Sequence, residues 1–301
     1  MTRAVAVLAL LALGPGPFSG GAEEDRGVLA PGATVRKLAD GFSFTEGPTC
    51  DADGNLFFTD QPNDRIMKWS VDGELTTFLQ PAGRSNGMYF DADGTLVACA
   101  DEKNEMWRIS SSGETTVLLK GHEGRALNGP NDVWLHPNGG VYFTDPFYKR
   151  PWWTHEKPPQ DGQHVYYLAP GADALVQVTD DLTQPNGIIG TPDGKTLYVA
   201  DIRARQTWRY DIQTDGRLAG KTLLCEQGSD GMTLDDEGNV YLTRGGVLVF
   251  DPAGNQIADI EVPERPANVS FCGPDRHTLF ITARTGLYSV RTRTKAGTPS
   301  K

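Results

Sequence analysis

A short pattern recurs six times along the chain, and it constrains the fold more than any other feature. Each copy begins with a polar residue and continues with a short apolar stretch, a turn and an apolar strand. Successive copies begin 40, 45, 55, 44 and 38 residues apart. We term their first residues the anchors: Glu46, Asn86, Asn131, Asn186, Asp230 and Asn268. Blades of β-propellers repeat at roughly 40–50 residues, with four strands in each blade.

The distance from each anchor to its turn is constant. Eight residues after the anchor, Arg276 stands in the sixth copy and glycine stands in the other five, as Gly54, Gly94, Gly139, Gly194 and Gly238. Acidic residues or asparagine followed by glycine are typical of hairpin turns, because glycine adopts positive φ angles readily. The strands that follow, such as Leu56–Asp60, are apolar almost throughout. Such strands are covered on both faces, as they are when blades stack.

A third and a fourth strand follow in most copies, for example at 66–69 and 76–79. The sixth copy ends before a clear fourth strand, and residues 33–38 are placed to supply it. Closing the ring in this way removes exposed sheet edges. The sequence therefore predicts an all-β, six-bladed β-propeller with four-stranded antiparallel blades and an N-terminal closing strand. The alternative is a solenoid that does not close.

The first residues are typical of an export signal. Arg3 precedes an apolar run over 4–13, and small residues follow up to position 22. We predict a signal peptide over 1–22, a single propeller domain over 23–301, and a secreted or periplasmic protein; a disordered tail or a membrane anchor is the alternative. The run is too short to span a bilayer. The net charge of −11 disfavours nucleic acid and anionic lipid as partners.

The four cysteines match no zinc-binding pattern. Cys50 and Cys272 occupy the same repeat position, which places them on inner strands of neighbouring blades. Such strands usually diverge beyond the reach of a disulfide. We therefore expect buried free thiols rather than bridges.

The third copy contains the longest insertion, residues 146–163. Long loops in compact domains are usually functional or mobile. We expect this insertion to border the mouth of a central site, with Trp152 and Trp153 offering stacking faces for a sugar-like ring. A surface loop whose aromatic residues cover a blade edge is the alternative.

The anchors carry oxygen in every side chain: two carboxylates and four carboxamides. In a ring, equivalent ends of the inner strands surround the axis, so these side chains are expected to meet at one centre. Asparagine and aspartate also favour turns, but this does not account for Glu46. A set of oxygen ligands without histidine or cysteine suits a hard divalent cation such as Ca²⁺ or Mg²⁺.

These residues resemble the SMP-30/gluconolactonase/LRE-like family of six-bladed calcium-dependent hydrolases. The resemblance covers roughly residues 35–288 and rests on four motifs in this order: Glu46-Gly-Pro48, Leu127-Asn-Gly-Pro-Asn-Asp132, Pro185-Asn-Gly187 and Ser229-Asp-Gly-Met232. It implies that Glu46, Asn186 and Asp230 bind a metal ion, that Asn131 contacts metal or substrate, and that Asp230 transfers a proton. Gly129 stands where animal aldonolactonases of the family have arginine, so this chain follows the bacterial pattern.

We therefore expect a metal-dependent hydrolase that opens a small-molecule sugar lactone, as gluconolactonases do, or a related cyclic ester. The cation, Ca²⁺ first and Mg²⁺, Mn²⁺ or Zn²⁺ as alternatives, would polarise the carbonyl while Asp230 moves the proton. The candidates for substrate binding are Asn86, Asn128, Asn131 and Asn268. The alternatives are a phosphotriester-type hydrolase using the same site and a propeller that binds a ligand or a protein without catalysis.

Overall fold

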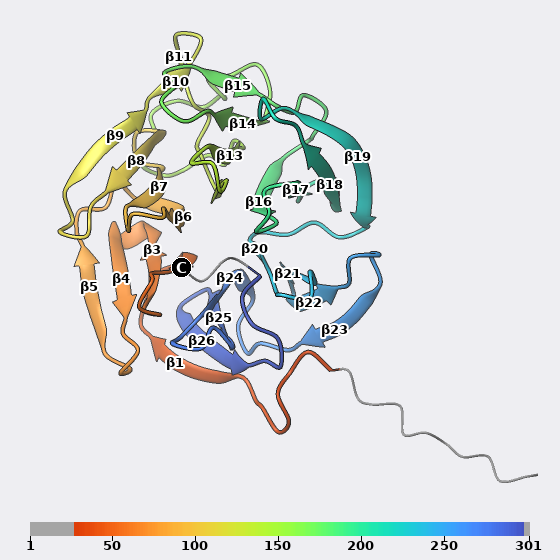
Figure 1. Ribbon diagram of the computed structural model, residues 1–301. Coiled ribbons are helices and arrows are strands. Elements are labelled where there is room, and N and C mark those ends of the chain that lie inside the picture. Colours follow the sequence, from red (N-terminus) through yellow and green to blue (C-terminus); the bar gives the residue numbers. More distant parts are fainter. Residues whose placement is uncertain (1–26, 298–301) are drawn as a thin grey trace, which may run out of the picture.

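Six four-stranded antiparallel sheets surround one axis in the computed structural model, which describes residues 27–297 (Figure 1). The predicted signal peptide lies outside these residues. The predicted six-bladed propeller is confirmed. Between residues 27 and 297 there is no helix long and apolar enough to cross a membrane.

Each blade is a meander whose first strand is innermost. Blade 1 consists of β2 (Thr45–Cys50), β3 (Leu56–Asp60), β4 (Arg65–Trp69) and β5 (Leu75–Leu79), and blade 2 of β6 (Ser85–Phe90), β7 (Leu96–Ala100), β8 (Glu105–Ile109) and β9 (Thr115–Leu119). Blade 3 consists of β12 (Val133–Leu135), β13 (Val141–Asp145), β14 (His164–Leu168) and β15 (Leu175–Gln177). Blade 4 consists of β16 (Pro185–Gly190), β17 (Thr196–Asp201), β18 (Gln206–Ile212) and β19 (Leu218–Cys225).

Blade 5 consists of β20 (Met232–Leu234), β21 (Val240–Arg244), β22 (Gly246–Phe250) and β23 (Gln256–Ile260). Blade 6 takes β24 (Pro266–Cys272), β25 (Thr278–Ala283) and β26 (Gly286–Arg291) from the C-terminal part of the chain. A two-stranded hairpin, β10 (Gly121–His122) and β11 (Arg125–Ala126), precedes blade 3, and a short 3₁₀ turn, η1 (Gln61–Asn63), follows β3.

The constant turn distance has the expected conformational cause. All five glycines that stand eight residues after an anchor have positive φ, from 70° to 91°. Arg276, which replaces glycine in the sixth copy, has a φ of 60°. Each inner hairpin therefore reverses at the same distance from its anchor, so the anchors stay at equivalent positions around the ring.

The second strand of each blade is buried on both faces, as its composition predicted. All five residues of β3, β7 and β13 are buried. Between blades 3 and 4, Trp134 and Tyr142 pack with Tyr198 in the largest apolar cluster. The blades are thus held together by apolar side chains that fill the space between sheets.

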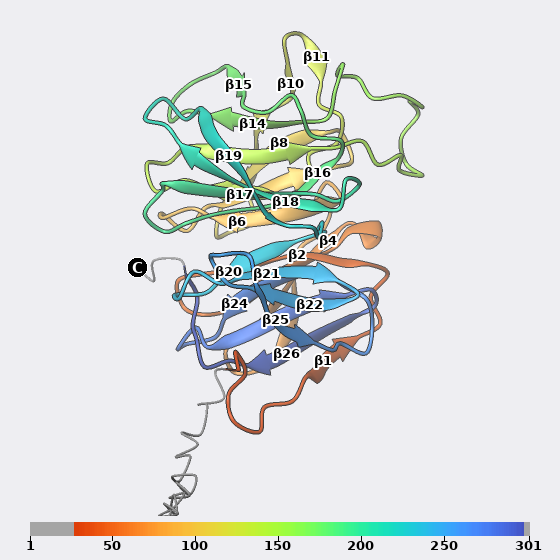
Figure 2. The same ribbon diagram turned by 90° about the vertical axis from the view of Figure 1, so that its right-hand side faces the viewer.

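The sixth blade is completed from the N-terminal side by β1 (Arg36–Asp40), which pairs antiparallel with β26. Figure 2 shows β1 beside β26 at the edge of the ring. The strand predicted over 33–38 therefore lies slightly later in the chain. Hydrogen bonds continue beyond it, since Arg293 N donates to Val28 O at 2.9 Å.

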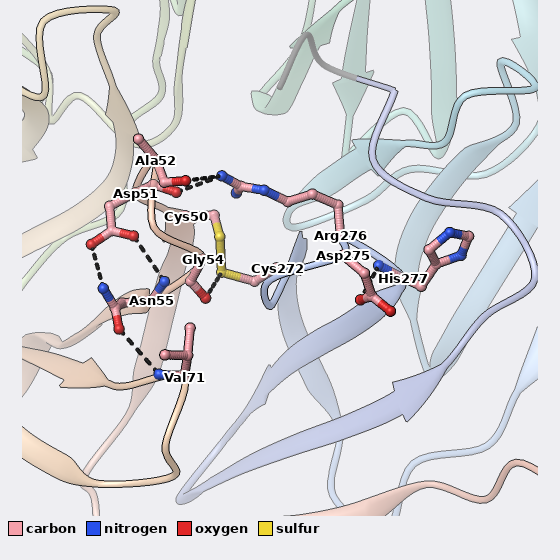
Figure 3. The surroundings of a disulfide bond; sticks show 10 residues. All are labelled: Cys50, Asp51, Ala52, Gly54, Asn55, Val71, Cys272, Asp275, Arg276 and His277. Atoms are coloured by element: carbon pink, nitrogen blue, oxygen red, sulfur yellow. Dashed lines mark hydrogen bonds between the residues drawn. A yellow bond between two sulfur atoms is a disulfide. The ribbon is translucent and has the colours of Figure 1, made fainter. Parts of the chain in front are cut away.

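The expectation of four free thiols was wrong for one pair. Cys50 and Cys272 form a disulfide whose Cα atoms lie 5.5 Å apart (Figure 3). Cys99 and Cys225 are free and buried. The turns after β2 and β24 touch, since Gly273 N donates to Gly54 O at 3.1 Å. A Cβ on Gly54 would collide with the backbone of Gly273. Glycine at this turn therefore lets the two strand ends come close enough for a disulfide.

Candidate active site

The anchors lie where the inner strands begin, at one end of the ring axis. Glu46, Asn86, Asn186 and Asn268 lie in β2, β6, β16 and β24, while Asn131 and Asp230 come two residues before β12 and β20. All are buried except Asp230, which keeps part of its surface exposed. The ring thus brings the six copies of the repeat to the same level along the axis.

Small residues and threonines join three of the anchors, Asn86, Asn131 and Asn186, to the preceding blade. Gly87 N donates to Asn131 O at 2.7 Å, and a Cβ on Gly87 would collide with Asp132. Thr144 Oγ1 donates to Asn186 O at 2.7 Å, and Thr59 Oγ1 donates to Asn86 O at 3.2 Å. These three anchors are therefore held through their own backbone oxygens, which leaves their side chains free to act at the centre.

Asn186 has an amide group whose orientation is set by its neighbours. Its Nδ2 donates to Asp230 Oδ1 at 2.8 Å and to the hydroxyl of Tyr148 at 2.9 Å. Both amide hydrogens are thereby used, and the buried Oδ1 has no partner. Asn86 Oδ1 is likewise buried without a partner. Buried oxygens of this kind are costly unless something else satisfies them.

Glu46 lies at the junction of blades 1 and 6. Its Oε2 accepts hydrogen bonds from Gly47 N at 2.8 Å and from Asn268 Nδ2 at 3.1 Å. Burial raises the pKa of Glu46 well above its ordinary value, and the negative charges of Asp230 and Asp132 raise it further. Burial also raises the pKa of Asp230, although the hydrogen bond from Asn186 and the positive charges of Arg265 and Arg150 lower it.

Asp132 is a central carboxylate that the sequence analysis did not single out. It follows the anchor Asn131, at the place where glycine follows four of the other anchors. Its Oδ1 accepts Val133 N at 3.0 Å, and burial raises its pKa to about 7. Its position in the repeat was the available signal, because a carboxylate replaces glycine beside the axis.

The centre thus combines mutually repelling carboxylates with amide oxygens that lack partners. Within residues 27–297 no three His, Cys, Asp or Glu side chains are grouped to hold a metal ion. Any cation here would therefore depend on amide oxygens as well as carboxylates. Hard cations such as Ca²⁺ accept this mixture, and a positive charge would relieve the repulsion. The residues present fit a hard divalent cation.

The remaining residues predicted from the sequence, Asn268 and Asn128, have different hydrogen-bond partners. Asn268 donates to Glu46, and its Oδ1 accepts Val269 N at 2.8 Å, so it orients Glu46. Asn128 is fully buried; its Nδ2 donates to Gly162 O at 2.7 Å and its Oδ1 accepts Gln160 N at 2.9 Å. Asn128 therefore holds the insertion in place, and its role in substrate binding stays a prediction without geometric support.

The 146–163 insertion reaches the centre through Tyr148, whose hydroxyl contacts Asn186. Trp153 does not offer a stacking face. It is 7% exposed, stacks on His155 at 4.9 Å between ring centroids, and donates from Nε1 to Asp101 O at 2.7 Å. Arg84 covers Trp152 at 4.6 Å from its ring centroid. Sequence reasoning missed Tyr148, although it lies only three residues beyond β13, at the end of the strand nearest the anchors.

Comparisons with known proteins agree with this geometry. A family model described as the SMP-30/Gluconolactonase/LRE-like region matches residues 44–285. The gluconolactonase of Zymomonas mobilis is 28% identical over 302 residues, covering 89% of this chain and 83% of that protein. The diisopropyl-fluorophosphatase of Loligo vulgaris is 25% identical over 275 residues, covering 82% of this chain and 87% of that protein. A solved gluconolactonase from Xanthomonas campestris is 28% identical with a TM-score of 0.83, covering 88% of this chain and 91% of that one.

Proposed function

Because the chain belongs to the SMP-30/gluconolactonase/LRE-like family, we propose that it is a divalent-cation-dependent hydrolase that opens a sugar lactone. Gluconolactonases and lactonases among its relatives support hydrolysis of a lactone bond. The observation that carries the proposal for this chain is the amide of Asn186. Its nitrogen donates one hydrogen to Asp230 and the other to Tyr148, and its buried oxygen is left without a partner at the ring centre.

Glu46, Asn186 and Asp230 would hold the cation, with Asn131 and the unpartnered oxygen of Asn86 as further ligands. A bound divalent cation acts as a Lewis acid that polarises the carbonyl of the ester. Asn268 keeps Glu46 oriented through its hydrogen bond of 3.1 Å. The backbone bonds between blades hold these groups in place before substrate arrives, which is the arrangement that electrostatic catalysis requires.

Asp230 is the proposed proton acceptor. It is the anchor with partial exposure, so water and substrate can reach it. The attacking water gives its proton to the Asp230 carboxylate as the new C–O bond forms, and the proton then passes to the ring oxygen as the acyl–oxygen bond breaks.

The test is a panel of lactones assayed after chelation and after adding back Ca²⁺, Mg²⁺, Mn²⁺ or Zn²⁺. We expect hydrolysis of at least one sugar lactone, loss of activity with chelator, and recovery with Ca²⁺. Activity that survives complete removal of metal would refute the cation requirement. Absence of hydrolysis with every lactone and every ion would refute the proposed activity.

Phosphotriester hydrolysis is the second candidate, because a diisopropyl-fluorophosphatase is among the relatives. Adding a fluorophosphate ester to the same panel separates the two, since the favoured substrate is the one with the larger kcat/KM. A propeller that only binds ligands would show affinity without turnover.

We further propose that the protein is secreted or periplasmic and that residues 1–22 are removed on export. The Cys50–Cys272 disulfide supports this proposal, because disulfides persist mainly in oxidising compartments. Mass spectrometry of the protein recovered outside the cytoplasm would identify the mature N-terminus. A full-length protein confined to the cytoplasm would contradict the proposal.

A further inference from the structure

An arginine of the insertion lies beside the catalytic centre and is not used in the mechanism above. The guanidinium of Arg150 lies 5.6 Å from the ring centroid of Tyr148, whose hydroxyl contacts Asn186. Its positive charge also acts on Asp230. Arg150 therefore lies close enough to meet a substrate whose ester group is at the centre.

Arg150 is held in one orientation by a buried partner. Its Nε donates to Asp101 Oδ2 at 2.7 Å, and Asp101 is 1% exposed. Gln61 Nε2 donates to the same oxygen at 2.8 Å, which fixes the carboxylate in turn. A guanidinium anchored through Nε keeps its two terminal nitrogens free to act as a planar pair of donors.

The terminal nitrogens of Arg150 make no hydrogen bond with any residue between 27 and 297. The side chain is 19% exposed, so these donors are accessible from the mouth. Trp152 lies against the guanidinium at 5.9 Å and is covered by Arg84 at 4.6 Å. A second cation, Arg84 from the loop before β6, thus lies near Arg150, and Trp152 does not offer an open apolar stacking face.

Positive charges accompany the carboxylates at this end of the ring. Arg84, Arg150 and Arg265 all lie at the end where the inner strands begin. The turns at the opposite end of the inner hairpins contain aspartate in every blade except the third, as at Asp51, Asp91, Asp193, Asp235 and Asp275. The arginines thus offset part of the negative charge of Glu46, Asp132 and Asp230 at the same end.

We propose that Arg150 binds an anionic substituent of the lactone, a carboxylate or a phosphate, through its two terminal nitrogens. This inference rests on the proposed function and narrows its substrate class. Paired N–H donors of arginine match the two oxygens of a carboxylate or phosphate group. With a neutral sugar lactone bound, the terminal nitrogens of Arg150 would donate to water instead of to the substrate.

The test compares three lactones: glucono-1,5-lactone, which is neutral, glucaro-1,4-lactone, which carries a carboxylate, and 6-phosphoglucono-1,5-lactone, which carries a phosphate. Arg150→Met removes the charge, and Arg150→Lys keeps the charge without the paired donors. The double variant Arg150→Met/Asp101→Asn avoids leaving Asp101 buried and unpaired. Arg108→Met is the control, since Arg108 is also ion-paired, with Asp91 at 3.4 Å, but on the outer part of blade 2.

For at least one anionic lactone we expect kcat/KM to fall roughly ten- to hundredfold in Arg150→Met and in the double variant, as hydrogen bonds to charged groups predict. With the neutral lactone the change should stay within about threefold. The kcat/KM of Arg150→Lys for the anionic lactone should lie between those of Arg150→Met and the unmodified protein. Arg108→Met should match the unmodified protein. Comparing the carboxylate with the phosphate identifies the group that is bound.

Equal losses with neutral and anionic lactones would overturn the inference, because Arg150 would then only support the loop. The same holds if the unmodified protein prefers the neutral lactone. Calorimetric titration with glucarate gives a readout that does not depend on turnover. If glucarate binds through Arg150 but no lactone is hydrolysed, the proposed function fails while the anion site stands.

Discussion

Asn186 connects three roles in one side chain. Its nitrogen fixes Asp230, its second hydrogen reaches Tyr148, and its oxygen is left without a partner in the centre. Glu46 and Asp230 are both carboxylates, but their surroundings differ. Asn268 and Gly47 donate to Glu46, whereas Asp230 has an exposed part that a water molecule can approach. This difference predicts different responses to the loss of each charge.

Asp230→Asn keeps the size of the side chain and an oxygen but removes the proposed proton acceptor. A general base is typically worth about 10²–10⁴-fold in rate. We expect turnover to fall by about that factor and saturating Ca²⁺ not to restore it. Glu46→Gln would lose only the charge of a proposed metal ligand, so excess Ca²⁺ should restore much of its activity.

Turnover of both variants across a calcium titration checks this, with circular dichroism as the control for folding. Full recovery of Asp230→Asn at high calcium would show that Asp230 is a ligand only. Loss of Glu46→Gln activity that no calcium concentration restores would show that Glu46 takes part in the chemistry.

At the level of elements, the insertion and the closing strand contribute in different ways. The insertion is pinned at its start by Arg150 and Trp153 on Asp101, and at its end by Asn128 on Gln160 and Gly162. In Figure 2 the loop between β13 and β14 extends outward from one end of the ring. Its inner part is packed like a core segment, which keeps Tyr148 and Arg150 in fixed positions.

Trp153→Ala tests whether this packing positions the loop. Truncating a buried tryptophan typically costs about 3–5 kcal/mol, and the hydrogen bond to Asp101 O is lost as well. We expect the free energy of unfolding to fall by about 3 kcal/mol and the loop to become sensitive to protease. Trp152→Ala is the matched control and should cost about 1 kcal/mol, because that ring is only partly buried. Equal losses in urea unfolding would contradict the assignment.

The closing strand carries a charge network that gives a pH dependence. Burial disfavours the ionised form of Glu264, but hydrogen bonds from Tyr288, Thr285 and Lys37 outweigh it and lower its pKa to about 2. A lowered carboxyl pKa contributes stability above the unfolded pKa of about 4.3, and this contribution is lost as pH falls toward 2. Glu264 therefore adds to the backbone pairing of β1 with β26 at neutral pH, and this addition is lost in acid.

Glu264→Gln should lower the free energy of unfolding at pH 7 by about 1–2 kcal/mol, a value reduced for the partial exposure of the side chain. The difference from the unmodified protein should shrink as pH falls below about 4.5. Urea unfolding between pH 7 and pH 2.5 measures this. Asp40→Asn, which removes an exposed partner of Lys37, is the control and should change stability by less than about 0.5 kcal/mol. A difference that is constant with pH would rule out the charge as its cause.

For the whole molecule, the Cys50–Cys272 disulfide closes a loop with a sequence separation of 222. In the chain-entropy model a loop of this length stabilises the fold by about 5 kcal/mol, which is an upper figure because engineered and native bridges often deliver less. We expect Cys50→Ala/Cys272→Ala to lower the free energy of unfolding by about 2–5 kcal/mol. Reductant should destabilise the unmodified protein by a similar amount and leave the variant unchanged. Reductant acting equally on both would show that the bridge contributes nothing.

The ring could be predicted from sequence because one local rule is repeated. A residue of positive φ eight positions after each anchor, glycine in five copies and Arg276 in the sixth, fixes the hairpin, and six equal hairpins determine the ring. The bridge could not be predicted, since it depends on how closely the turns at Gly54 and Gly273 approach, and nothing in either turn alone encodes that distance. The positions of Tyr148 and Arg150 beside the centre could not be predicted for a related reason. An insertion has no counterpart in the other copies against which its residues can be compared.

The position of the bridge along the chain also determines how the protein responds to a pull on its two ends. Tension would peel β1 from β26 and then pass from Cys50 to Cys272 through the sulfur atoms, bypassing every residue between them. Blades 2 to 5 and five of the anchors are shielded from this force. Glu46 is the exception, since it precedes Cys50 and lies on the mechanically exposed segment. Stretching would therefore displace one carboxylate of the centre, together with β25 and β26 of blade 6, while blades 2 to 5 stay within the loop that the bridge closes.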